Sequence, residues 1–342
     1  MDKYKEKRLR SQPFRSLIKP YVSKKSYKLI NDCGNFLMFL SDRTLEKKKL
    51  NTGEFCKNRF CPMCAWRQAR RDALKIAVLM EHLKLEENMQ MIFLTLTTPN
   101  VTGDNLNDEI NHFNKAFKKL MQRREVKRLV QGYIRKLEVT YDSKFFITPD
   151  LYKRKKKYYD YRNLGIGDKN PTYDTYNPHF HVCIAVPREY GRKSRTMQFI
   201  TDNKWLEMWR EACDDPSITQ VKVQYIKTGR AEECKEMFEL AKYTAKDSDY
   251  LLSPEVFKVF YEALKGKQLI VYSGLFKEAL KLYEAGELDM YKPKDMVEYI
   301  YMLHYEWSKS NGGTYKEILK RELTKEEYEK YNKCKIEELN MD

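Results

Sequence analysis

Apolar side chains alternate with other residues in four segments of the chain, which is the pattern of half-buried β-strands. These segments are 91–98 (MIFLTLTT), 132–142 (GYIRKLEVTYD), 179–186 (HFHVCIAV) and 220–228 (QVKVQYIKT). Helical periodicity marks residues 65–84, about 104–124, 197–213 and 231–246. From residue 91 onward, the order strand, helix, strand, strand, helix, strand, helix predicts the α+β class. We expect a central antiparallel β-sheet with helices packed on one face.

The chain of 342 residues is long enough for about two domains, and its composition divides it into three parts. Residues 1–87 form a basic arm, a cysteine-rich module and an arginine-rich helix. Residues 88–279 hold the sheet, interrupted by a basic insertion at 143–177. Residues 280–342 show short helical patterns, so we expect a C-terminal helical region.

The net charge points to a polyanionic partner. Lysine and arginine number 65 against 49 acidic residues, which leaves a formal charge of +16. Such an excess suits DNA, RNA or an anionic membrane. The N-terminal segment lacks the apolar core of a signal peptide, and no apolar run reaches the roughly 18 residues that a membrane span needs. We therefore expect a soluble cytoplasmic protein with no membrane partner.

Two histidines in the third strand form a candidate metal site. His179 and His181 are two residues apart, so their side chains lie on one face of a strand while Phe180 lies on the other. Paired imidazoles on a rigid strand suit a divalent metal, and Glu138 of the second strand is the candidate carboxylate ligand. The alternatives are two surface imidazoles beside a turn and an exposed strand carboxylate.

The helix at 231–246 carries a second candidate site. Tyr243 lies nearly opposite the apolar stripe of this helix, on a face with Glu239, Lys242 and Lys246. Glu239 and Tyr243 are four residues apart, so both side chains can reach one phosphate. The alternative is an ordinary solvated helix face.

Four cysteines gather in the first fifth of the chain, at Cys33, Cys56, Cys61 and Cys64. In a cytoplasmic protein cysteines remain reduced, so their spacing favours a structural Zn²⁺ site over disulfides. Unligated buried thiols are the alternative. The helix that follows the cluster begins with three arginines that we assign to DNA binding: Arg67, Arg70 and Arg71.

The insertion at 143–177 carries a run of cations among tyrosines. The run consists of Lys153, Arg154, Lys155, Lys156 and Lys157. Such a segment grips single-stranded DNA by neutralising phosphates and stacking bases. The segment is too polar to belong to the hydrophobic core. The alternative to DNA binding is therefore a mobile, solvated loop.

Three motifs in order add a resemblance to a known family. FLTLTT (93–98), the His179-Phe180-His181 strand and ELAKYTAKDSDYL (239–251) resemble the motifs of the HUH endonucleases. The match is nearest to the single-tyrosine rolling-circle replication initiators of small bacterial plasmids, and it runs from about residue 56 to residue 279. The resemblance implies a palm-like antiparallel sheet that carries the active site.

The resemblance also implies roles for particular residues. In that family the two histidines and a third polar residue, here Glu138, hold Mg²⁺ or Mn²⁺. Tyr243 matches the nucleophile that forms a 5′-phosphotyrosyl bond and leaves a 3′-OH primer. Glu239 matches the glutamate of the terminating step. The chain departs from many relatives at Asn177, where they have a further histidine, so this position offers no extra ligand.

The expected function is therefore origin nicking in plasmid rolling-circle replication. The partners implied are plasmid DNA at a double-strand origin, in single-stranded or cruciform form, the host helicase and polymerase, and a second copy of the chain in a homodimer. One alternative is a zinc-knuckle nucleic-acid-binding protein without catalysis, which leaves Tyr243 and the histidines without a role. The other is a relaxase or transposase with the same chemistry.

Overall fold

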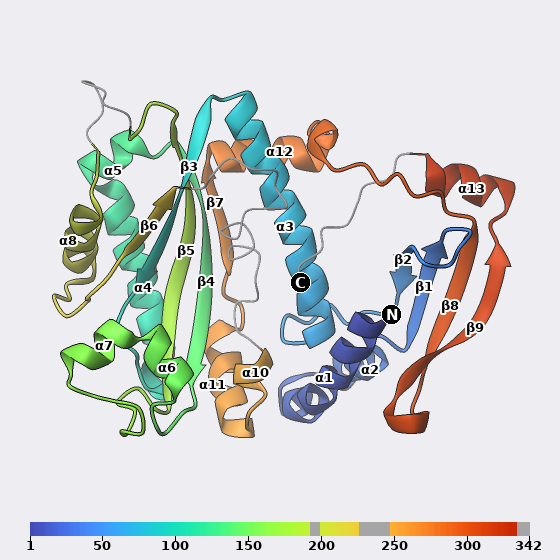
Figure 1. The fold of residues 1–342 in the computed structure, drawn as a ribbon, viewed down its shortest axis with the longest axis horizontal. Coiled ribbons are helices and arrows are strands. Elements are labelled where there is room, and N and C mark those ends of the chain that lie inside the picture. The colour runs from blue at the N-terminus through green and yellow to red at the C-terminus, as the bar shows by residue number, and fades with distance from the viewer. Residues whose placement is uncertain (192–198, 226–246, 334–342) are drawn as a thin grey trace.

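The structure is a computed structural model that describes residues 1–191, 199–225 and 247–333 (Figure 1). The strands are β1 (Phe36–Ser41), β2 (Lys48–Gly53), β3 (Met89–Thr97), β4 (Gly132–Asp142), β5 (Thr175–Pro187), β6 (Lys222–Tyr225), β7 (Ile270–Gly274), β8 (Tyr301–Ser308) and β9 (Thr314–Glu322). The helices are α1 (Asp2–Ile18), α2 (Lys24–Asp32), α3 (Pro62–Leu85), α4 (Leu106–Gln122), α5 (Arg124–Leu129), α6 (Pro149–Arg154), α7 (Lys156–Tyr161), α8 (Asp202–Cys213), α10 (Asp247–Tyr250), α11 (Pro254–Leu264), α12 (Leu275–Ala285) and α13 (Lys325–Asn332). Two antiparallel sheets with helices confirm the α+β class.

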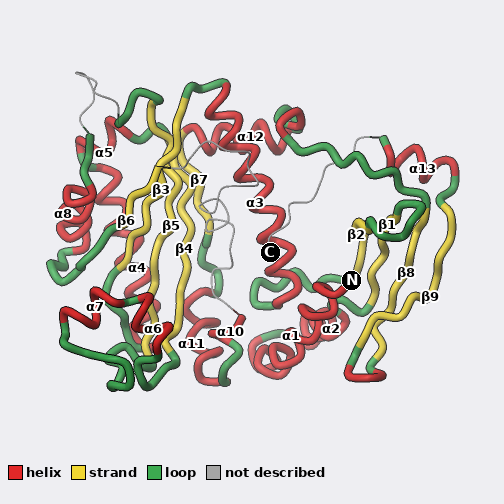
Figure 2. Tube along the Cα trace, viewed as in Figure 1, coloured by secondary structure: helices red, strands yellow, loops and turns green. Residues whose placement is uncertain are grey.

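The larger sheet contains every strand predicted from periodicity. Its order is β6-β3-β5-β4-β7, and each neighbouring pair is antiparallel. The strands lie side by side in the tube view of Figure 2. The sequence analysis did not foresee β7, which pairs with β4 at the edge of this sheet. β5, the strand of the two histidines, therefore lies at the centre of the sheet.

Helices cover both faces of the larger sheet, whereas the sequence analysis placed them on one face. On the first face, β3 and β5 pack against α4 and α8, with the Phe180 ring 4.7 Å from Phe113. On the second face, α3 and α12 pack against the end of the sheet that contains Cys183 and Ala185 (Figure 1). The run Val182–Val186 is apolar at every position, which is typical of a strand segment buried on both faces. Toward residue 179, the second face carries polar side chains instead.

The smaller sheet joins the two ends of the chain and corrects the expected C-terminal helical region. Its order is β2-β1-β8-β9, so strands from 1–87 pair with strands from 280–342. Leu303 and Tyr305 pack on one face of β8 and Met302 packs on the other. Because both faces bury apolar side chains, the two-residue period is hidden and the segment reads as helical. Helix α1 lies between this sheet and α3, with the Tyr4 ring 5.4 Å from Phe39 and 5.0 Å from Trp66.

The insertion at 143–177 is folded and has a small core of its own. Ile147, Leu151 and Tyr159 are buried against one another between α6 and α7. Lys155 Nζ donates to Asp142 Oδ2 at 2.8 Å, which ties the insertion to the end of β4. The run of cations therefore lies on short helices, where the sequence analysis left open a solvated loop. No helix in the described part of the chain is long and apolar enough to cross a membrane.

Candidate functional site

The register of β4 and β5 brings one carboxylate and two imidazoles together. Glu138 lies opposite His179 across the strand pair. Glu138 Oε2 is 2.9 Å from His181 Nε2 and 3.3 Å from His179 Nε2. One ligand atom from each of the three residues lies within 4.8 Å of the others. The structure therefore brings together the three side chains that the sequence analysis assigned to a metal site, and we call them the triad.

The triad is well shielded from solvent. Glu138 and His181 are buried, and His179 is half-buried. Burial raises the pKa of the Glu138 carboxyl, but the hydrogen bonds and charges of His179 and His181 lower that pKa by more. The pKa of Glu138 therefore lies well below its usual range, and the side chain is a carboxylate at neutral pH.

The surroundings of the triad orient its rings. Phe93 stacks on the His181 ring at 5.6 Å, and the His179 ring meets the His181 ring edge-on at 4.8 Å. His179 Nδ1 lies 3.3 Å from the carbonyl oxygen of Asn177, a contact in which the ring N–H donates. In a neutral ring this leaves the lone pair of His179 Nε2 pointing toward Glu138.

The donor set of the triad fits a divalent cation. His179 Nε2 and Glu138 Oε2 lie 3.3 Å apart. Their lone pairs repel each other unless a proton or a cation lies between the two atoms. Two neighbouring ligands of an octahedral ion, each at about 2.1 Å, lie about 3 Å apart. The Asn177 side chain is engaged elsewhere, donating to the Thr98 carbonyl at 2.8 Å. The described part of the site thus offers three candidate protein ligands.

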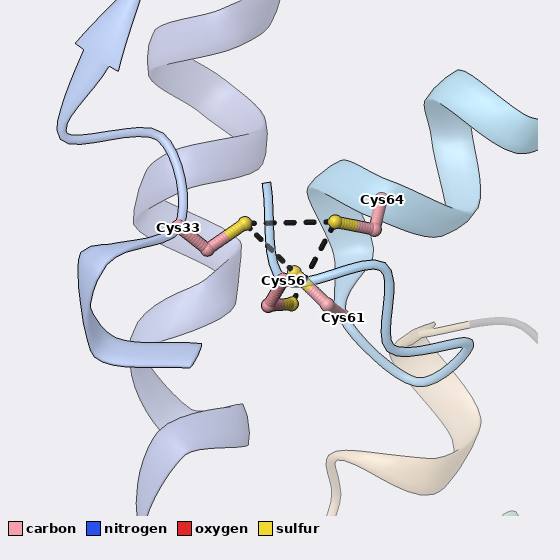
Figure 3. A group of neighbouring side chains, drawn as sticks. All are labelled: Cys33, Cys56, Cys61 and Cys64. Carbon is pink, nitrogen blue, oxygen red and sulfur yellow. Dashed lines mark hydrogen bonds between the residues drawn. The ribbon is translucent and has the colours of Figure 1, made fainter. Parts of the chain in front are cut away.

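Four cysteines form a second cluster, shown in Figure 3. Cys33 follows α2, Cys56 follows β2, and Cys61 and Cys64 lie at the start of α3. The Sγ–Sγ distances are 3.7 Å for Cys33–Cys61 and 3.6 Å for both Cys33–Cys64 and Cys56–Cys64. Four thiolates at about 2.3 Å from a tetrahedral metal lie about 3.8 Å apart. The four cysteines therefore have the spacing of a four-thiolate metal site.

The cysteine cluster is shielded from solvent. Cys33, Cys61 and Cys64 are buried and Cys56 is half-buried. The hydrogen bonds among the thiols hold the pKa of Cys61 well below its ordinary value and raise the pKa of Cys33 and of Cys56 above theirs, so without a metal one thiolate is stabilised by its protonated neighbours. Deprotonated sulfur is the form that binds metal. The other described cysteines, Cys183 and Cys213, are buried elsewhere.

The predicted DNA-binding cations lie in two regions. Arg71 of α3 is exposed, Arg67 stacks 3.5 Å above the Phe55 ring, and Arg70 lies 5.3 Å from the Trp66 ring. In the insertion, Lys153, Arg154 and Lys156 are exposed and Lys155 is paired with Asp142. The backbone of Lys157 belongs to α7, and its side chain lies outside the described part.

The second candidate site lies outside the described residues. This applies to Tyr243, Glu239, Lys242 and Lys246. The described chain stops at Tyr225 of β6, which pairs with β3, and resumes at Asp247 of α10. Asp249 of α10 accepts a hydrogen bond from the backbone N–H of Tyr141 at 3.3 Å. β3 and β4 are the two neighbours of β5, the strand of the two triad histidines.

Comparison with known proteins identifies the family. A family of replication proteins matches residues 47–318 of the chain. The chain belongs to this family. A Staphylococcus aureus relative named "Protein rep" is 43% identical to this replication protein over 253 residues, which cover 74% of the chain and 96% of the relative. A "Protein rep" of a Bacillus species is 32% identical over 310 residues, covering 83% of the chain and 90% of the relative. No solved structure matches.

Beside the triad, this replication protein has a cavity that the sequence analysis did not foresee. Its volume is about 730 Å³. Its cationic lining consists of Lys57, Arg59, Arg67, Arg71, Lys136 and Lys267. Strand alternation alone places Lys136 on the same face of the sheet as Glu138. The sequence could therefore have predicted that Lys136 lies near the triad. Lys267 could not be found in this way, because its position depends on β7, which was not predicted.

Proposed function

We propose that this replication protein initiates rolling-circle replication of a plasmid by nicking DNA at the origin. The main observation behind the proposal is the triad of Glu138, His179 and His181. The register of β4 and β5 brings their ligand atoms within 4.8 Å of one another. The family match supports a role in replication, and the net charge of +16 supports a DNA substrate. The partners proposed with it are a double-strand origin in single-stranded or cruciform form, host helicase and polymerase, and a second copy of the chain.

The triad would hold Mg²⁺ or Mn²⁺ through His179 Nε2, His181 Nε2 and a carboxylate oxygen of Glu138. The bound ion would neutralise a non-bridging phosphate oxygen and so lower the barrier to attack on phosphorus. Glu138 would bind as a carboxylate and the two histidines as neutral rings, so the triad would present one negative charge to the cation. Phe93 and the sheet exclude water from one side of the ligands.

Tyr243 is the proposed nucleophile. Its phenolic oxygen would form a bond to phosphorus while the bond from phosphorus to the 3′-oxygen breaks, and the released oxygen takes a proton to become the 3′-OH primer. Because a phenolate is a better leaving group than a sugar hydroxyl, the phosphotyrosyl bond remains available for rejoining. Three residues separate Tyr243 from Asp247, where α10 begins beside β4. This short separation supports the assignment.

Glu239 and the neighbouring lysines have proposed supporting roles. Glu239 would accept a proton from the water that ends a replication round after Tyr243 is already esterified. Lys242 and Lys246, which the sequence places on the Tyr243 face of the predicted helix, would contact phosphates of the same DNA strand. Further phosphate contacts are proposed for Arg67, Arg70 and Arg71, and for the exposed cations of the insertion.

The test of the proposed function is the formation of a covalent protein–DNA product. The protein is incubated with Mn²⁺ and with supercoiled or single-stranded DNA that carries its plasmid origin. We expect relaxed, nicked plasmid and a protein band that carries labelled DNA through denaturing electrophoresis. DNA binding to the origin with neither product would favour a binding protein without catalysis. A product formed only at a transfer origin or a transposon end would favour a relaxase or transposase.

The cysteine cluster is proposed to bind one structural Zn²⁺, because thiolates select zinc over hard cations and the four sulfurs have tetrahedral spacing. We expect about one zinc ion per chain in purified protein, and near none in Cys61→Ser or Cys64→Ser. Elemental analysis measures this directly. Cys213→Ala is the matched control, since Cys213 is buried in α8 away from the cluster and this variant should keep its zinc. If the parent protein contains no zinc, the four cysteines are unligated buried thiols.

A further inference from the structure

We propose that Arg8 and Arg15 of α1 neutralise the negative charge of the metal-loaded cysteine cluster and thereby raise its affinity for zinc. This inference rests on the proposed Zn²⁺ site, and it gives a role to a helix that the sequence analysis described only as a basic arm. Four thiolates around a divalent ion carry a net charge of about −2. Such a charge is costly to bury unless cations lie beside it.

One face of α1 lies against the cysteine cluster. Ser11 Oγ is 3.9 Å from Cys61 Sγ. Arg8 lies three residues before Ser11 and Arg15 lies four residues after it, so the three side chains share a face of the helix. Arg8 Nη1 donates to the carbonyl oxygen of Cys33. This face therefore brings two cations toward the cysteines.

Arg8 is buried and hydrogen-bonded to neutral groups. Only 3% of the residue is exposed. Its guanidinium donates to the backbone carbonyls of Cys33 and Asn31 and to the side-chain carbonyl of Asn35. Because all three acceptors are uncharged, these hydrogen bonds fix the position of Arg8 and leave its positive charge to be balanced by another group.

Arg15 has buried donors that lack acceptors. Its Nε and Nη2 atoms are shielded from solvent and have no hydrogen-bond partner in the described part of the chain. Burial lowers the pKa of the Arg15 guanidinium. The negative charges of Cys33 and Cys61 act in the opposite direction, more strongly than the charge of Asp32 at the end of α2. The cysteines are therefore the acidic groups that act most strongly on Arg15.

The need for these cations depends on the metal. Without a metal, the protonated thiols of the cluster stabilise one thiolate, that of Cys61. With a metal, all four sulfurs bind as thiolates and their protons are released. Two arginines then match the net charge of about −2. Charge compensation by α1 therefore favours the loaded cluster over the empty one.

The first test measures the zinc affinity of the purified protein by competition with a chromogenic chelator. Arg15→Met removes the charge and keeps much of the length of the side chain. We expect it to lower the zinc affinity by about 10–100-fold, the range for partners that lie outside the metal's own ligands. Arg15→Lys keeps the charge and should keep most of the affinity. Arg10→Met is the matched control, because Arg10 is exposed on the same helix and pairs with Glu6.

A second test uses the sign of a stability change. Cys61→Ser should contain no zinc, and it also lacks the thiolate whose pKa is lowered. In this background Arg15 has lost the charge that it compensates, so Arg15→Met should raise the melting temperature or leave it unchanged. In the zinc-loaded parent the same substitution should lower the melting temperature.

Equal zinc affinities in Arg15→Met and Arg10→Met would overturn the inference and leave the zinc site in place. Equal losses in Arg15→Met and Arg15→Lys would also overturn it, because packing rather than charge would then be responsible. A melting temperature that falls equally in both backgrounds has the same meaning. A parent chain without zinc removes the zinc site and this inference together. None of these measurements involves DNA cleavage, so the proposed nicking activity is judged separately.

Discussion

Tyr243→Phe is expected to abolish covalent adduct formation and nicking while leaving DNA binding unchanged. Phenylalanine keeps the ring and loses the phenolic oxygen, so no bond to phosphorus can form. Removing a nucleophile in this way lowers the rate by about 10⁴-fold or more. The measurement is single-turnover cleavage of labelled origin DNA with Mn²⁺, together with anisotropy on the same oligonucleotide without metal.

Two other tyrosines are the next candidates if cleavage survives. Tyr225 ends β6, and Tyr250 belongs to α10. The Tyr250 hydroxyl already donates a hydrogen bond to the Phe60 carbonyl at 3.0 Å, and the residue is only 3% exposed, so Tyr250 is the weaker candidate. Tyr328→Phe is the matched control, because Tyr328 lies on α13 and donates to Glu298. Nicking at the parental rate in Tyr243→Phe would assign the nucleophile to another residue.

The sequence was sufficient to predict the strands of the site but not their neighbours. The alternation around His179 and Glu138 predicted two strands and the faces of their side chains, because a strand has a period of two whatever it pairs with. Which residue of β4 lies opposite His179 depends on register, a long-range property of the pairing. From the sequence alone Glu138 could be a metal ligand or an exposed strand carboxylate. The pairing of Glu138 with His179 places it beside the two histidines.

Segments buried on both sides defeated the periodicity argument. β8 has apolar residues on both faces, and it was taken for part of a helical region. β5 is apolar on both faces from Val182 onward, a sign of burial on both faces that the period-two interpretation did not use, so the second layer formed by α3 and α12 was missed. The cavity could not be predicted from local patterns either. Its cationic side chains come from segments that are distant in the sequence and meet only in the folded chain. Local patterns therefore predicted the chemistry of single elements better than the surfaces that several elements share.

His181→Ala is expected to remove metal-dependent cleavage. The variant leaves Glu138 and His179 as the two remaining proposed ligands, and two ligands hold a hard divalent cation poorly. Losing an outer-shell partner of a ligand already lowers metal affinity by about 10–100-fold, so losing a ligand should lower it by more than about 100-fold. Calorimetric titration with Mn²⁺ measures the affinity, and the Mn²⁺ concentration that gives half-maximal cleavage should rise in parallel.

Two further variants separate the loss of a ligand from damage to the sheet. Glu138→Gln keeps the size of the side chain and removes its charge, so we expect weakened Mn²⁺ binding in a protein with the parental melting temperature. His112→Ala is the matched control, because His112 is half-buried on α4, outside the triad, and contacts only Glu109 among the ion pairs of the described chain. It should keep both affinity and rate. Parental Mn²⁺ affinity in both His181→Ala and Glu138→Gln would place the metal elsewhere. In that case the close contact of Glu138 with the two imidazoles would be an internal ion pair that stabilises the pairing of β4 with β5, and the triad would lose its part in cleavage.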